Sequence, residues 1–225
     1  MKKLFLCVSI LVGVSLLLAG TAGADTKTYQ DSVPLAGTNW TSSITVPKFD
    51  PALGILNSIK FTLDGHVEGL AQFESEDGSP TTVTMNLSAK LKLQRPDGSL
   101  LVEVIPLVST TDNVTAYDGT FDFDGGSGRT YSSLSNDKSD SFTSPPPASD
   151  LALFTGSGNI TMPVVATVNS TVSGGGQLTA YFQTSASAQG TVVYDYTPIP
   201  EPSGMVAILA GLSSLAGLVV RHRRK

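Results

Sequence analysis

Residues that could perform chemistry are few in this chain, and the densest acidic group is Asp118, Asp122 and Asp124. Ca²⁺ binds six to eight oxygen atoms, and carboxylates two residues apart before a glycine-rich turn can supply several. The spacing matches neither an EF-hand loop nor a nonapeptide repeat. The alternative, which the spacing favours, is an extended strand that runs into a hairpin. Asp122 and Asp124 would then lie on its solvated face, with Phe121 and Phe123 on the other.

Candidates for catalysis are even fewer. His66 is the only histidine between the two ends of the chain, and it lies between Asp64 and Glu68. Serines are abundant, but no Gly-x-Ser-x-Gly elbow is present. A glycosidase needs two facing acids in a cleft, and no motif singles out such a pair among the carboxylates. We expect His66 to be a surface strand residue beside a turn at Asp64-Gly65. The sequence therefore predicts a protein that is not an enzyme and has no cofactor, with bound calcium as the less favoured alternative.

Trp40 is the only tryptophan, next to Asn39 and Thr41. An exposed tryptophan on a sheet is a platform on which a sugar ring can stack. The alternative, which we favour, is a tryptophan buried near the first strand.

The segments that must position these residues alternate between apolar and polar side chains. The apolar positions of the clearest run are Val83, Met85, Leu87, Ala89, Leu91 and Leu93. Period-two alternation predicts half-buried antiparallel strands. Similar runs contain Ile59, Phe61 and Leu63, then Ile160, Met162, Val164, Ala166 and Val168, then Leu178, Ala180 and Phe182.

Turn signals separate these runs at Asp64-Gly65, Asp77-Gly78, Asp97-Gly98, Asp118-Gly119 and Gly174-Gly175-Gly176. No long amphipathic helix is predicted, so residues 25–196 are expected to form one all-β antiparallel sandwich, jelly-roll-like. The polar segment 135–150, which contains three consecutive prolines, is expected to be a long loop, with a domain boundary as the less favoured alternative.

The N-terminus has the three parts of a secretory signal peptide over residues 1–24. Lys2 and Lys3 precede an apolar run, and Ala22-Gly23-Ala24 supplies the small-residue site, so we expect cleavage after Ala24. The alternative is a retained membrane helix. About 20 apolar residues are needed to span a bilayer, and the apolar run of residues 4–18 is shorter. Cys7 is the only cysteine of the chain and would be removed with this segment, which excludes disulfides and thiol chemistry in the mature protein.

The pattern of residues near the C-terminus indicates a second segment that enters the membrane. Residues 197–203 form a proline-rich linker, and residues 204–220 contain no charged side chain. The chain then ends on a basic cluster that includes Arg221, Arg223, Arg224 and Lys225. We expect a transmembrane helix over 204–220 with a basic cytoplasmic tail over 221–225. A buried core helix is the alternative, and the basic cluster argues against it.

The sequence Ile199-Pro200-Glu201-Pro202-Ser203, followed by an apolar helix and a basic terminus, resembles the PEP-CTERM sorting signal of Gram-negative bacteria. The resemblance implies that signal peptidase and an exosortase process the chain, and that it is anchored in the inner membrane through 204–220 before it reaches the surface or the medium. Pro200, Glu201 and Pro202 would be the residues that the exosortase recognises.

A second resemblance covers the body. Segments around Thr38-Asn39-Trp40, Val46-Pro47-Lys48-Phe49, Arg95-Pro96-Asp97-Gly98 and Tyr117-Asp118-Gly119 are similar to the bacterial choice-of-anchor E domain. This resemblance implies an extracellular location and carries no assigned activity.

The net charge of the body argues against one class of binding partner. Residues 25–200 contain 8 basic and 18 acidic side chains, a net charge of −10, which argues against nucleic-acid binding. The sequence as a whole predicts a secreted, non-catalytic surface or extracellular-matrix protein associated with exopolysaccharide. The alternative function is a carbohydrate-binding module, with or without calcium.

Overall fold

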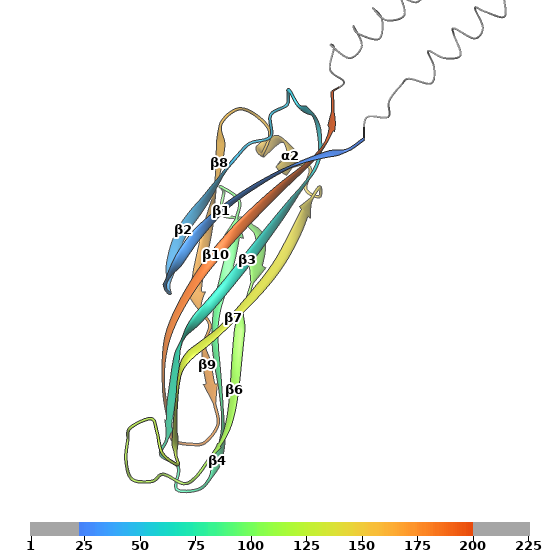
Figure 1. Ribbon diagram of the computed structural model, residues 1–225. Coiled ribbons are helices and arrows are strands. Elements are labelled where there is room, and N and C mark those ends of the chain that lie inside the picture. Colours follow the sequence, from blue (N-terminus) through green and yellow to red (C-terminus); the bar gives the residue numbers. More distant parts are fainter. Residues whose placement is uncertain (1–22, 200–225) are drawn as a thin grey trace, which may run out of the picture.

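The computed structural model describes residues 23–199, which form two antiparallel β-sheets packed face to face (Figure 1). The strands and the single short helix are β1 (Asp25–Gly37), β2 (Trp40–Pro47), β3 (Gly54–Ser75), β4 (Thr81–Gln94), β5 (Leu100–Val104), β6 (Leu107–Val114), β7 (Gly128–Ser144), α2 (Ser149–Leu153), β8 (Asn159–Val168), β9 (Thr171–Ser173) and β10 (Leu178–Pro198). The predicted antiparallel β-sandwich is confirmed.

The first sheet has the order β1-β10-β3-β7, and the second has β2-β8-β4-β5. β4 is long enough to pair with β6 and β9 along its first half and with β5 and β8 along its second. At about 3.3 Å per residue, the 22 residues of β3 extend roughly 70 Å. The sandwich is correspondingly elongated (Figure 1).

The inner faces of both sheets form the core, as the alternating runs predict. Every apolar position of the run from Val83 to Leu93 is fully buried, and so are Ile59, Phe61 and Leu63. A smaller cluster around Phe73 and Met85 fills the end farthest from the termini. Val168 departs from the prediction: it is 47% exposed, because β8 ends there and leaves the sheet.

The first and last strands are neighbours. Asp25 pairs with Tyr196, and β1 then runs antiparallel to β10 for most of its length. Both ends of the described chain therefore leave the sandwich at the same end, beside α2 (Figure 1). Among residues 23–199, no helix combines the length and the apolarity that crossing a membrane requires. The helix predicted over 204–220 lies outside the described residues.

Two sequence predictions of turns and loops are wrong. Asp64-Gly65 is not a turn but the middle of β3. A Cβ atom on Gly65 would lie 2.5 Å from Leu91 Cδ1 and 2.7 Å from Val104 Cγ2, so a residue without a side chain is needed for sheet packing. Residues 135–144 are not loop but the second half of β7. They are polar because β7 is an edge strand with most of its side chains exposed.

α2 is held to the β4–β5 turn by a bidentate ion pair. Arg95 Nε lies 2.7 Å from Asp150 Oδ1, and Arg95 Nη2 lies 2.9 Å from Asp150 Oδ2. The Asp150 side chain is 1% exposed and that of Arg95 is 13% exposed. The Arg95 guanidinium lowers the pKa of the Asp150 carboxyl group. This contact fastens the segment after β7 onto the second sheet.

Candidate functional site

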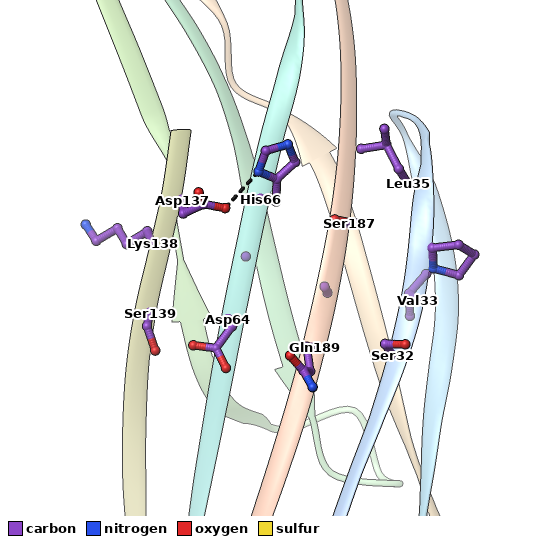
Figure 2. A pocket seen from close by; sticks show the side chains of 13 residues that line it. Ser32, Val33, Leu35, Asp64, His66, Asp137, Lys138, Ser139, Ser187 and Gln189 are labelled. Atoms are coloured by element: carbon purple, nitrogen blue, oxygen red, sulfur yellow. Dashed lines mark hydrogen bonds and ion pairs between the residues drawn. The ribbon is translucent and has the colours of Figure 1, made fainter. Parts of the chain in front are cut away.

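A groove of about 490 Å³ crosses the outer face of the first sheet, and all four of its strands contribute (Figure 2). Its position follows from the period-two pattern of β3. Leu63 and Val67 point into the core, so Asp64, His66 and Glu68 point outward. Residues that are far apart in the sequence meet here because the antiparallel register places them side by side.

One row of side chains across the sheet consists of Ser187, His66 and Asp137. His66 on β3 is registered with Ser187 on β10 and with Asp137 on β7. A parallel row, two residues along each strand, consists of Ser32, Gln189, Asp64 and Ser139. The groove floor therefore presents hydroxyl, amide, imidazole and carboxylate groups side by side (Figure 2).

His66 lies between two carboxylates. Its Nδ1 is 2.7 Å from Asp137 Oδ1 and its Nε2 is 3.2 Å from Glu68 Oε2. The hydrogen bond to Asp137 is the main cause that raises the pKa of His66. Burial opposes the shift, and the contact with Glu68 adds to it. A protonated ring can donate to both carboxylates at once, whereas a neutral ring can donate to only one.

Ser187, His66 and Asp137 are the residue types of a hydrolytic triad, but they are not arranged as one. The Nε2 atom that would act on a serine hydroxyl faces Glu68 instead. Ser187 and His66 lie on β10 and β3, which pair with neighbours on both sides, so their main-chain N–H groups are used in the sheet. An oxyanion hole needs free donors of this kind. The groove thus supports binding better than acyl transfer.

The two walls of the groove differ in character. On one side, β1 shifts register between Val33 and Ala36, and Leu35 is left 45% exposed beside Pro34. On the other side, Lys138 and its neighbours on β7 are polar and exposed. An apolar edge beside a hydrogen-bonding floor suits a ligand that has both hydroxyl groups and C–H faces, as sugars do.

Trp40 lies outside the groove and is half-buried, so the favoured interpretation of a buried tryptophan holds only in part. Its indole Nε1 donates to the carbonyl oxygen of Ala186 at 3.3 Å, and its ring contacts the main core. A hollow of about 170 Å³ borders it, between the start of β2 and the end of β8. Its half-buried ring offers less stacking surface than a platform needs.

The predicted acidic strand at Asp118–Asp124 is wrong as secondary structure, because residues 115–127 form a loop between β6 and β7. Asp118 accepts hydrogen bonds from the N–H groups of Thr120 and Gly126, which lower the pKa of its carboxyl group. Asp122 accepts from the N–H of Asp124. These bonds bend the chain, and Phe123 takes a positive φ of 58° that no strand allows.

Within residues 23–199, no group of three or more acidic or histidine side chains is arranged to hold a metal ion. Calcium at Asp118, Asp122 and Asp124 stays a prediction.

Ala24, the expected cleavage site, is exposed immediately before β1. The sorting motif Pro200, Glu201 and Pro202 and the basic residues Arg221, Arg223, Arg224 and Lys225 lie outside the described residues.

Sequence reasoning identified His66 but missed Asp137 and Ser187. The sequence of one strand does not show which residues of its neighbours will lie beside it in the sheet. Asp137 lies in a polar segment without alternation, and Ser187 is one of many serines. Two of the residues that carry the choice-of-anchor E resemblance, Phe49 and Arg95, make structural contacts. Phe49 is buried between Tyr194 and Tyr196, and Arg95 holds α2.

No protein-family model matches the chain, and no curated protein sequence matches it. Solved structures align with it over most of its length at low identity. A structure of infectious bursal disease virus, Gx strain, matches at 13% identity with a TM-score of 0.18, covering 84% of this chain and 48% of the viral one. Turnip yellow mosaic virus matches at 10% identity with a TM-score of 0.18, covering 80% and 98%.

A structure described as a carbohydrate-binding module of the β-sandwich superfamily matches at 10% identity with a TM-score of 0.16, covering 79% of this chain and 56% of that one. The chain spans less than half the length of the bursal disease virus proteins it matches first. At these TM-scores the matches carry no argument about function.

Proposed function

We propose that this chain is an exported, non-catalytic protein of the cell surface or extracellular matrix, associated with exopolysaccharide and sorted by an exosortase through Pro200-Glu201-Pro202. The observation that supports this most is the pairing of Asp25 with Tyr196. It brings Ala24, the expected signal-peptidase site, and the end of β10, which directly precedes the PEP motif in the sequence, to the same end of the sandwich. The two signals that the proposal requires, one before β1 and one after β10, would thus both act at one end of the sandwich.

Mass spectrometry of both termini of the protein, in membrane, surface and medium fractions, tests the sorting proposal. We expect an N-terminus at Asp25 and a C-terminus between Pro200 and Ser203 in the outer fractions. Glu201→Gln changes the motif and should leave the chain in the inner membrane, whereas Glu76→Gln, which changes a glutamate outside the motif, should be processed normally. A C-terminus at Lys225 that is confined to the inner membrane would contradict sorting.

The groove favours a second candidate function, the binding of a polysaccharide. Its floor offers the donors and acceptors that sugar hydroxyl groups need, and Leu35 offers an apolar contact. Asp64, Glu68 and Asp137 outnumber the basic groups around His66, so the groove suits a neutral or amine-bearing polysaccharide better than an acidic one. The bound chain would lie across the strands, as the two polar rows do.

Retention on insoluble polysaccharides tests the binding proposal. Gln189→Ala, in the groove, should reduce retention, whereas Gln183→Ala should not, because it removes an exposed amide from the same strand outside the groove. Trp40→Ala distinguishes the other location: a loss of retention in this variant alone, with the fold intact, would place binding at the tryptophan. No retention on neutral or amine-bearing glycans would contradict the second function and leave the first standing.

A further inference from the structure

Glu74 is a carboxylate that the sandwich buries without a partner of opposite charge. It lies near the end of β3, opposite Gly128 on β7, and is 0% exposed. Its Oε2 atom accepts a hydrogen bond from the N–H of Phe123 at 2.8 Å, and its Oε1 atom is buried with no partner. Among residues 23–199, no basic side chain forms an ion pair with it. Burying an unpaired carboxylate is strongly unfavourable, so a compensating group is expected at this position.

The loop of residues 115–127 folds over this carboxylate. A Cβ atom on Gly128 would collide with Glu74 Oε2 and would lie 2.6 Å from the main-chain nitrogen of Asp124, so glycine is what allows the carboxylate to enter the loop. The loop places the side chains of Asp118 and Asp122 in turns stabilised by hydrogen bonds from main-chain N–H groups. Glu74 therefore projects into a segment that is already acidic.

Arg129 is the basic residue closest in sequence to this loop, and its guanidinium contacts main-chain carbonyl oxygens and Asp112 rather than Glu74. It donates to the carbonyl oxygens of Gly125 and Gly128 and lies 3.9 Å from Asp112. Burial raises the pKa of the Tyr117 hydroxyl, and the charges of Glu76, Glu74, Asp118 and Asp122 raise it further, which agrees with these carboxylates lying near one another. This end of the sandwich thus has several negative charges and little to balance them.

We propose that Glu74 anchors a calcium site beneath the loop of residues 115–127. Since no three acidic or histidine side chains in the described part of the chain are arranged for a metal, the other ligands would include main-chain carbonyl oxygens and water, both of which Ca²⁺ accepts. An irregular loop suits Ca²⁺ better than Mg²⁺, which demands near-ideal octahedral geometry. The site would fix the loop to β3 and is independent of the groove and of sorting.

Thermal unfolding of the purified protein with CaCl₂, with MgCl₂ and with EDTA tests this proposal. If the calcium concentration is about 100 times the Kd, the ratio of folded to unfolded protein should rise about 100-fold. Glu74→Gln keeps the size of the side chain and removes the charge, and it should abolish the shift. Glu103→Gln is the control, because it removes a carboxylate from β5, which pairs with the second half of β4, and it should keep the shift.

The proposal is overturned if calcium leaves the unfolding temperature unchanged, if magnesium raises it equally, or if Glu74→Gln responds as the unsubstituted protein does. Luminescence of Tb³⁺ excited through tyrosine provides a test that does not depend on the folding of the glutamine variant. We expect a signal that Ca²⁺ displaces and that Tyr117→Phe weakens while the calcium-dependent thermal shift remains. The absence of any displaceable signal would also overturn the site.

Discussion

Replacing Asp150 by asparagine should destabilise the sandwich far more than breaking an ordinary surface ion pair. The substitution keeps the shape of the side chain but leaves the Arg95 guanidinium, with its side chain 13% exposed, without its partner charge. Removing one partner of a buried pair costs about 3–5 kcal/mol, and the partial exposure of Arg95 places the expected loss near the lower value, ~3 kcal/mol. For a domain of this size, that loss corresponds to a fall in Tm of roughly 6–12 °C.

The assay is urea unfolding followed by circular dichroism, with Glu103→Gln as the control. Glu103 pairs with Lys92 at 3.5 Å, and their side chains are 32% and 39% exposed, so the control should lose no more than about 1 kcal/mol. If the free energies of unfolding of the two variants agree within about 1 kcal/mol, the Arg95–Asp150 pair does not stabilise the attachment of α2 to the second sheet.

The pH dependence of the same comparison adds a second check. Because Arg95 lowers the pKa of Asp150 in the folded state, the stabilisation by this pair is present above the unfolded value of about 3.9. It is lost as the pH falls through the lower folded value. The difference in stability between the unsubstituted protein and Asp150→Asn should therefore shrink below about pH 4, and a difference that stays constant there would contradict the ion-pair explanation.

Three further predictions concern the first sheet and its far turn. Asp137→Asn should lower the pKa of His66 in an NMR titration, because that contact is the main cause of its elevation. The protonated His66 stabilises the fold fully below about pH 6.5, and its contribution is lost as the pH rises through the raised folded pKa, so the stability advantage over Asp137→Asn should vanish at alkaline pH. Gly65→Ala should cost about 1–3 kcal/mol of unfolding free energy by overpacking, whereas Gly37→Ala, with nothing within 4 Å of its Cβ, should cost less. Asp77→Ala removes the acceptor of two main-chain N–H groups in the β9–β10 turn, and hydrogen exchange there should accelerate.

The inner strands could be predicted because their two faces meet such different surroundings. Between Val83 and Leu93, one face packs on the opposite sheet and the other is polar, so the two-residue period is unbroken. The turns at Asp77, at Asp97 and at the three glycines after Ser173 were predicted for a similar reason: local turn chemistry is contained in two or three adjacent residues.

Gly65 shows where this reasoning fails. An aspartate followed by glycine is a strong turn signal, yet here the glycine is required by the side chains of Leu91 and Val104 on the opposite sheet. The prediction for β7 is wrong for another reason. Because β7 is an edge strand, its polar residues alternate with other polar residues, and the segment shows no two-residue hydrophobic period. Both errors concern contacts between segments that the sequence places far apart.

The same limit applies to the functional residues, and it explains how they are arranged. Gly54, His66 and Glu74 all lie on β3, a strand that starts at the end where the chain termini leave the sandwich. At ~3.3 Å per residue, His66 lies about 40 Å and Glu74 about 66 Å along the strand from Gly54. The groove therefore lies midway along the sandwich, and the acidic loop lies at the end opposite the one where the described chain begins and ends (Figure 1). Only the register with β10 and β7 turns these positions into sites, because Ser187, Asp137 and Gly128 reach them from other strands.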